Sequence, residues 1–202
     1  MSTTESIREK VLQYPLGHPI MLREFLAYGG RAAVDQALAR LVRVGILTRP
    51  ARGVYTRPKR NPYVGEVFPE PMKVAEAIAR ETGSAVQVHG AEAARRMGFT
   101  TQVPNRPIFY TSGPNRRFRL GEMEVVLKHV SPRKLALAGR PAGVALTALW
   151  YLGKDAVDAK TIEHVHAQLT PEEFTALMSV SFLMPGWMHD AFMRHGGRRS
   201  RA

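Results

Sequence analysis

The stretch RAAVDQALARLVRVGILTRPARGVYTRP, residues 31–58, decides the fold of the first part of the chain. Its first half has the periodicity of an amphipathic helix, because Leu38 and Leu41 fall within about 40° of Val34 when each residue turns the helix by about 100°. Gly45 ends this helix. Two β-prone runs follow at 46–49 and 53–57, joined by the segment PAR. We therefore expect a helix followed by a β-hairpin with a turn-forming proline.

Two further helices are predicted before this stretch. TTESIREKVLQYP, residues 3–15, begins with capping residues, carries an apolar stripe and ends at a proline. HPIMLREFLAYGG, residues 18–30, indicates a second short helix closed by two glycines. Three short helices followed by a hairpin are typical of a winged helix-turn-helix, with the third helix as recognition helix and the hairpin as wing.

The remainder of the chain predicts a second domain that mixes a small sheet with helices. A helix at 72–83 and a short strand at 85–88 that runs into a helix precede three strands separated by turns, and the last part is helical. The predicted class is therefore α+β: an N-terminal winged helix, a second α+β domain with a small antiparallel sheet, and a helical C-terminal segment. The predicted limits are 1–60 for the winged helix, 61–71 for a proline-rich linker, 72–195 for the second domain and 196–202 for a flexible tail.

Composition restricts the chemistry of the protein. The 202 residues carry a net charge of +12 and include no cysteine, which excludes disulfides, thiolate zinc sites and cysteine nucleophiles. Residues 1–60 hold 11 basic and 4 acidic side chains, 61–154 hold 13 and 7, and 155–202 hold 5 and 6. This basic excess favours a polyanion such as nucleic acid, although solubility alone also explains it. Without a signal peptide or an apolar run long enough to cross a membrane, we expect a cytoplasmic protein.

The third helix carries side chains that suit DNA on or beside its outer face. Arginine can bind guanine through two hydrogen bonds, and glutamine can bind adenine in the same way. Small residues at the start of the helix would let it approach base edges closely. The alternative is an ordinary amphipathic surface helix with arginines for solubility. The candidate recognition residues are Arg31, Ala32, Ala33, Gln36, Arg40 and Arg43.

The hairpin predicts a second group of DNA contacts. A β-turn bearing arginines can straddle a phosphate backbone or enter a minor groove. Tyr55 either donates a hydrogen bond to a phosphate or packs the hairpin onto the third helix. The candidate wing residues are Arg49, Arg52, Tyr55, Arg57, Lys59 and Arg60.

A second basic cluster lies in the middle of the chain. If RRFRL is a strand, Arg117 and Arg119 share one face and Phe118 lies on the other. The cluster predicts a second DNA surface, an RNA surface or a solvated face. Its candidate residues are Arg116, Arg117, Arg119, Lys128, Arg133 and Lys134.

Catalytic patterns are absent from the sequence. His164 and His166 lie two apart on a predicted helix, so they point about 200° apart and cannot hold one metal. The sequence has no metalloprotease, P-loop or nucleophile-elbow motif. We therefore expect no catalytic residue, metal or cofactor. A nucleic-acid-processing enzyme stays an alternative that requires Glu122, Glu124 and His129 to converge, and an RNA- or protein-binding module is another.

The pattern ALxRLVxxGxL followed by RxARGVYxRP resembles the N-terminal winged helix of AbiEi-type antitoxins of bacterial type IV toxin–antitoxin systems. VHGAEAARRMGFTTQVPNRPIFYTSGPNRR and HVSPRKLALAGRPAGVALTALWYLG are similar to the second domain of AbiEi-like proteins, many of them uncharacterised. Together the likeness covers residues 1–154, and the last helices depart from the pattern.

The resemblance implies a repressor that binds an inverted repeat in the promoter of its own operon. It also implies an antitoxin that counteracts a nucleotidyltransferase toxin without forming a stable complex with it. The recognition-helix and wing residues would contact double-stranded DNA, and the antitoxic face would include residues 116–119 and 133–134. We expect monomers that bind cooperatively or a homodimer, because an inverted repeat offers two half-sites.

Overall fold

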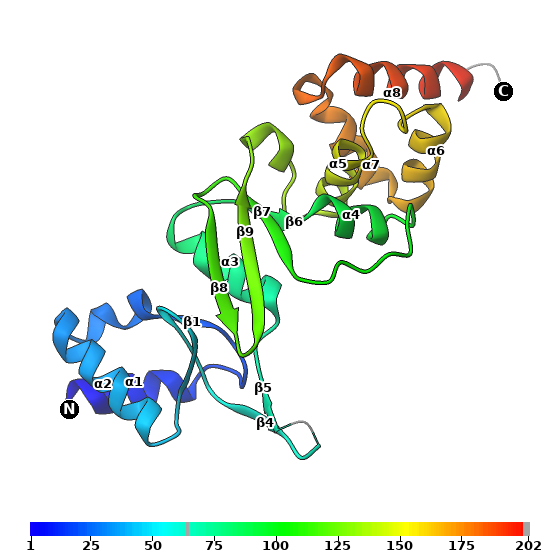
Figure 1. Ribbon diagram of the computed structural model, residues 1–202. Coiled ribbons are helices and arrows are strands. Elements are labelled where there is room, and N and C mark those ends of the chain that lie inside the picture. The colour runs from blue at the N-terminus through cyan, green and yellow to red at the C-terminus, as the bar shows by residue number, and fades with distance from the viewer. Residues whose placement is uncertain (64, 200–202) are drawn as a thin grey trace. The chain divides into compact units, whose positions relative to one another are not determined.

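A computed structural model describes residues 1–63 and 65–199 of the protein. The fold is α+β, with helices and small antiparallel sheets (Figure 1). The chain forms two compact units. Unit 1 comprises Met1–Gly83 and Arg116–Val126, and unit 2 comprises Ser84–Asn115 and Leu127–Ala202.

Unit 1 begins with the predicted winged helix. Its three-stranded sheet is antiparallel with strand order β1-β3-β2, so the strand before the second helical element pairs with the second strand of the wing. The elements are α1 (Thr3–Leu12), β1 (Ile20–Met21), the 3₁₀ helix η1 (Leu22–Tyr28), α2 (Arg31–Arg43), β2 (Thr48–Ala51) and β3 (Val54–Thr56).

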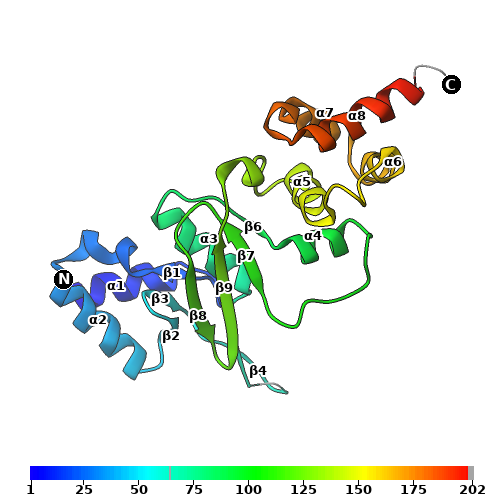
Figure 2. The same ribbon diagram turned by 45° about the horizontal axis from the view of Figure 1, so that its top comes forward.

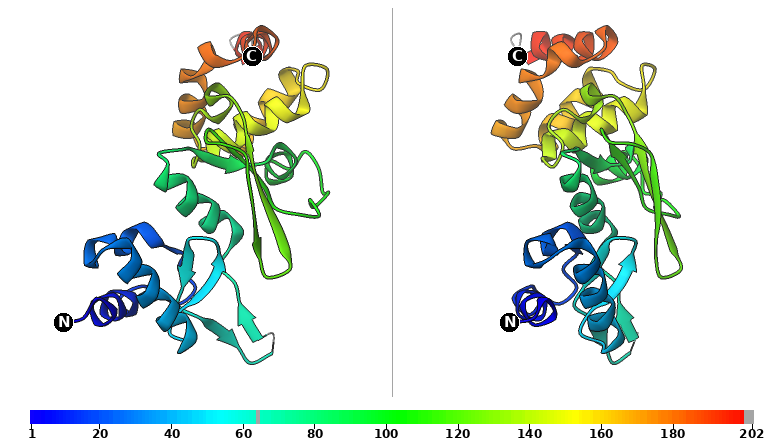
Figure 3. Two further views of the ribbon diagram at one scale, coloured as in Figure 1. Left: turned by 60° about the vertical axis from the view of Figure 1, so that its left-hand side comes forward. Right: turned by 90° about the vertical axis from the view of Figure 1, so that its left-hand side faces the viewer.

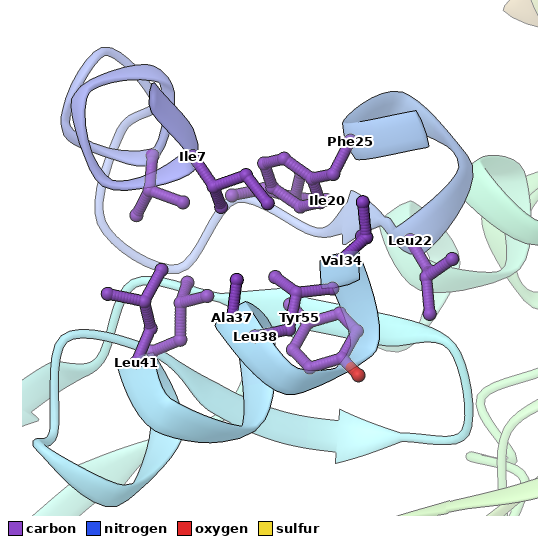
Figure 4. Close-up of a cluster of buried hydrophobic side chains, with 11 residues drawn as sticks. Ile7, Ile20, Leu22, Phe25, Val34, Ala37, Leu38, Leu41 and Tyr55 are labelled. Atoms are coloured by element: carbon purple, nitrogen blue, oxygen red, sulfur yellow. The ribbon is translucent and has the colours of Figure 1, made fainter. Parts of the chain in front are cut away.

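The core of the winged helix joins these elements (Figure 4). Val34, Leu38 and Leu41 of α2 are buried, as the periodicity predicts, and they pack with Ile7 of α1 and Phe25 of η1. Burying each such side chain contributes about 1.5–3 kcal/mol, so this stripe fixes which face of α2 remains outside.

The second predicted helix is partly wrong. Ile20 and Met21 pair with Tyr55 and Val54 as strand β1, and a 3₁₀ helix follows. Strand β3 needs a partner for its outer backbone groups, and that non-local requirement overrides the local helical pattern.

The wing turn also lies later than predicted. Pro50 and Ala51 belong to β2, and the turn consists of Arg52 and Gly53 between the paired residues Ala51 and Val54. The backbone of Gly53 has a φ of +78°, which a glycine adopts without a steric cost. The pairing register shifts between Thr48 and Ala51, where Pro50 has no N–H to donate.

The predicted linker at 61–71 is not a structureless spacer. A second hairpin pairs β4 (Lys59–Asn61) with β5 (Gly65–Val67), and it extends beyond the strands of the wing (Figure 3). Helix α3 (Pro71–Glu81) follows. The unit therefore continues past the predicted limit at residue 60. It also takes in β8 (Arg116–Leu120) and the start of β9 (Met123–His129).

Unit 2 contains a short antiparallel strand pair and most of the helices. Val86–Val88 (β6) pairs with Ile108–Thr111 (β7), and the four-stranded sheet has the order β6-β7-β9-β8, so strand β9 is shared by the two units. The helical elements are α4 (Gly90–Arg96), η2 (Pro132–Leu135), α5 (Pro141–Leu152), α6 (Ala159–Gln168), α7 (Pro171–Ser179), η3 (Ser181–Leu183) and α8 (Gly186–Arg199).

Helix α5 lies at the centre of unit 2. It packs on α4 and on α7 (Figure 2), and most of its side chains from Ala142 to Leu149 are buried. A Cβ at Gly90 would lie 2.5 Å from Tyr151 Cβ, so only glycine allows α4 to begin so close to α5. Helix α8 includes residues 196–199 of the predicted flexible tail, and residues 200–202 lie outside the described part of the chain.

Candidate nucleic-acid interface

The outer face of α2 is exposed and basic. Each of its six candidate residues is exposed, whereas Val34, Leu38 and Leu41 are buried on the opposite face. Arg40 and Arg43 lie in the last turn, where a positive charge complements the helix dipole. Over residues 1–63 and 65–199, neither of these two arginines forms an ion pair.

Asp35, an acidic residue that was not among the predicted site residues, lies on the same helix. Asp35 Oδ2 accepts a hydrogen bond of 3.0 Å from Nε of Arg31, four residues earlier. This spacing is a known signal for an ion pair on a helix and could have been found from the sequence. The bond uses Nε, so the two terminal nitrogens of the Arg31 guanidinium remain free to meet a second acceptor.

The wing offers Arg49 and Arg52, both exposed, with Arg52 in the turn. Tyr55 instead belongs to the core, with a residue exposure of 5%. Burial raises the pKa of its phenol, and the guanidinium carbon of Arg49 lies 5.8 Å from its ring centre. Tyr55 therefore packs the wing onto α2, which favours the structural alternative over a phosphate contact.

Arg57 is not a free wing contact. Its guanidinium donates hydrogen bonds of 3.1 Å to the carbonyl of Leu12 and 2.8 Å to that of Tyr14. The last carbonyls of a helix have no partner within the helix, and Arg57 satisfies this need at the end of α1. Both bonds use the same terminal nitrogen of Arg57, so the structure gives this side chain a structural role, and its contact with DNA stays a prediction. Lys59 and Arg60, also predicted in the wing, lie on β4 of the second hairpin.

A groove of about 880 Å³ runs between α2 and the wing. Guanidinium groups outnumber carboxylates along it, and a hollow lined mainly by one sign of charge concentrates its field on an incoming polyanion. Arg23 and Glu81 were not predicted, because they lie far from the wing in sequence. The charged lining residues are Arg23, Arg31, Arg49, Arg52 and Arg116, with Asp35 and Glu81.

The second basic cluster does not form one surface within a single unit. Arg116, Arg117 and Arg119 belong to β8 in unit 1, where Arg117 and Arg119 are exposed and Phe118 is less so, which confirms the predicted alternation. Unit 2 contains the others, Lys128, Arg133 and Lys134.

Several basic side chains of unit 2 contact a partner within the protein. The guanidinium carbon of Arg133 and Nζ of Lys134 lie 5.3 and 4.7 Å from the ring centre of Trp150. Arg95 and Arg96 donate to Glu92 at 2.7 and 2.8 Å. These hydrogen bonds lower the pKa of Glu92 to about 2, and the bond from Arg95 has the largest effect.

The three residues that the enzyme alternative requires divide between the two units. Glu122 and Glu124 fall in unit 1 and His129 in unit 2, where its Nδ1 lies 2.9 Å from the carbonyl oxygen of Gly113. His164 Nε2 lies 2.7 Å from the carbonyl oxygen of Met97, and the ring of His166 packs against Phe174. In the described part of the chain, no three His, Cys, Asp or Glu residues are placed to hold a metal ion. No helix of that part is long and apolar enough to cross a membrane.

Fold and site together define a winged-helix protein of the α+β class with an arginine-lined groove beside its third helical element. The chain belongs to the DUF6088 family, a family of unknown function, whose model matches residues 6–177. No curated protein matches the sequence. The crystal structure of the RV2827C protein from Mycobacterium tuberculosis is similar at 19% identity and a TM-score of 0.44, over 90% of this chain and 75% of that one.

Proposed function

We propose that this protein is a sequence-specific DNA-binding repressor without catalytic activity. The observation that carries the proposal is the groove between α2 and the wing, in which five arginines face two acidic residues. Phosphates on duplex DNA supply the negative charge that such a groove lacks. An exposed basic third helix also suits DNA better than it suits a module that uses this helix for protein contacts.

In this proposal α2 lies in the major groove. Gln36 and Arg40 read base edges, and the small side chains of Ala32 and Ala33 allow the start of the helix to approach them. Arg31 is held by Asp35 through Nε and presents its terminal nitrogens to DNA. Arg43, Arg49 and Arg52 bind phosphates and set the register of the protein on the duplex.

The resemblance to AbiEi-type antitoxins extends the proposal to a cytoplasmic antitoxin that represses its own operon. Two copies would occupy an inverted repeat, as cooperating monomers or as a homodimer. The protein would counteract a nucleotidyltransferase toxin without binding it stably. Because the second basic cluster divides between the units, its antitoxic role can be tested in two parts: Arg116, Arg117 and Arg119, or Lys128, Arg133 and Lys134.

A gel-shift titration with the DNA upstream of the protein's own gene tests the repressor proposal. The wild type should bind that DNA more tightly than unrelated DNA, and Arg40→Ala with Arg43→Ala should weaken binding. Lys154→Ala with Arg194→Ala is the matched control, because it removes two exposed charges from unit 2. Equal binding by all three proteins, or a preference for RNA of the same length, would contradict the proposal.

Co-expression tests the antitoxin part separately. A nucleotidyltransferase gene should flank the protein's own gene, and its induced toxicity should be relieved by the wild type. Lack of such a gene or of relief would overturn the antitoxin role and leave DNA binding standing.

A further inference from the structure

The second hairpin, β4–β5, is a separate basic element beside the wing. Lys59 and Arg60 on β4 are exposed, and Arg60 lies opposite Glu66 on β5. Within the described part of the chain, neither Lys59 nor Arg60 forms an ion pair. Their charges are therefore free to meet an external anion.

The hairpin continues the arginine-lined groove. A hollow of about 370 Å³ lies between the end of α2, strand β2 and the hairpin, and Arg60, Glu66 and Phe68 line its far side. Val42 and Arg49 line this hollow and the larger groove alike. A nucleic-acid backbone that leaves the groove at Arg49 therefore meets Arg60 next.

The base of the hairpin contacts two other segments of unit 1. The N–H of Gly17 donates to the carbonyl of Arg57 at 3.0 Å, immediately before β4. After β5, the ring of Phe68 lies so close to Gly121 that a Cβ there would be 2.7 Å from it. Strands β4 and β5 are therefore attached to unit 1 at both ends of the hairpin.

The tip presents an aromatic side chain that the fold does not use. Tyr63 is 94% exposed, and its backbone N–H donates to Oδ1 of Asn61 at 2.8 Å in an Asx turn. Gly65 closes the loop with a φ of +74°. A large exposed ring three residues after Arg60 in the chain matches what nucleic-acid-binding arms present to a minor groove or to base edges.

We propose that the β4–β5 hairpin is a second DNA-contacting arm of this protein. Lys59 and Arg60 bind phosphates of the duplex that flanks the site read by α2, and Tyr63 packs into the adjacent minor groove. This inference rests on the proposed DNA-binding function.

Hydroxyl-radical footprinting and anisotropy titrations on the upstream DNA test the arm. Tyr63→Ala and Lys59→Ala with Arg60→Ala should each weaken binding about tenfold, and they should remove protection at one flank while the central protection remains. Tyr63→Phe should bind like the wild type, because the ring makes the contact. Phe182→Ala is the control, since it removes a ring that is 78% exposed in unit 2.

The outcomes separate the two proposals. If the wild type binds and depends on Arg40 and Arg43, but the hairpin variants keep full affinity and the full footprint, the arm is overturned and the repressor proposal stands. If the wild type protects no DNA, both fall. Melting temperatures of the hairpin variants should equal that of the wild type, which excludes unfolding as the cause of a weaker footprint.

Discussion

Helices α2 in unit 1 and α4 in unit 2 both carry arginines, but only α4 pairs every one of its arginines with a carboxylate of the protein. On α4, Arg95 and Arg96 both bind Glu92, with side chains 38% and 46% exposed. On α2, Arg40 and Arg43 have no ion-pair partner in the described residues. Arginine content alone therefore does not indicate a binding surface, and the partners of each arginine have to be known.

The same contrast extends beyond the two helices. In unit 2, Arg140 binds Glu173 at 2.8 Å, and Arg133 and Lys134 lie over Trp150. In unit 1, Arg49 and Arg52 line an open groove. Unit 1 also holds basic side chains that bind within the protein: Arg57 closes the end of α1, and Arg31 pairs with Asp35. Arg49 and Arg52 form no ion pair in the part of the chain that the structure describes, so their charges remain available to an external anion.

Charge reversal at the groove should have the largest effect. Arg49→Glu with Arg52→Glu replaces two attractive phosphate contacts in the groove by repulsion, so we expect the affinity for upstream DNA to fall more than about a hundredfold in anisotropy titrations. Lys154→Glu with Arg194→Glu changes the net charge by the same amount in unit 2. We expect this control pair to lower the DNA affinity much less. Similar losses for both pairs would mean that net charge, and not the groove, drives binding.

Replacement of Gln36 separates base reading from phosphate binding. Gln36→Ala should reduce discrimination at one base pair of the operator by about 1–3 kcal/mol, measured by competition between operator variants. Arg52→Ala should weaken binding to all of these variants evenly. An even loss for Gln36→Ala would show that its amide reads no base.

Replacement of Arg57 tests whether this arginine stabilises the end of α1. Arg57→Ala leaves the carbonyls of Leu12 and Tyr14 without a donor, so the free energy of unfolding should fall by about 1–2 kcal/mol in urea titrations. Its operator preference should not change. Arg60→Ala, an exposed neighbour, should keep wild-type stability; a stable Arg57→Ala variant with altered operator preference would return Arg57 to the DNA surface.

Replacement of Glu92 tests the ion pairs of α4. We expect it to have the smallest effect of these changes. Glu92→Gln should destabilise the protein by about 1 kcal/mol at pH 7, because the pair is partly exposed. The folded-state pKa of about 2 lies below the usual value of 4.5, so the wild type has this stabilisation in full above pH 4.5 and loses it as pH falls toward 2. Urea titrations at pH 7 and pH 3 should therefore show a smaller difference at pH 3. DNA affinity at pH 7 should not change, and a pH-independent difference would contradict the ion-pair assignment.

Periodicity predicted the winged helix because the apolar stripe of α2 is a local property of its residues. It could not predict β1, since Ile20 becomes a strand only through pairing with Tyr55. Proline-rich composition predicted a linker, yet the Asx turn at Asn61 and the φ of Gly65 close a hairpin there. The apolar stripe of α2 also predicted which residues of this helix are exposed, because they lie on the face away from it.

The partners of individual charges were not predictable in the same way. Arg57 acts on carbonyls more than forty residues earlier in the chain, at a separation of 43 residues for Tyr14. Arg23 and Arg116 reach the groove from separate segments. Such contacts depend on the tertiary fold, and residue type alone does not encode them. Asp35, by contrast, could have been found from its spacing to Arg31.

The salt dependence of DNA affinity tests the central claim most directly. For the wild type, the logarithm of the binding constant should fall steeply with the logarithm of salt concentration. Alanine at Arg43, Arg49 and Arg52 should make that slope shallower by about 0.9 for each phosphate that is no longer neutralised, whereas Lys154→Ala with Arg194→Ala should leave it unchanged. An unchanged slope for the variant that lacks these phosphate contacts would contradict the account.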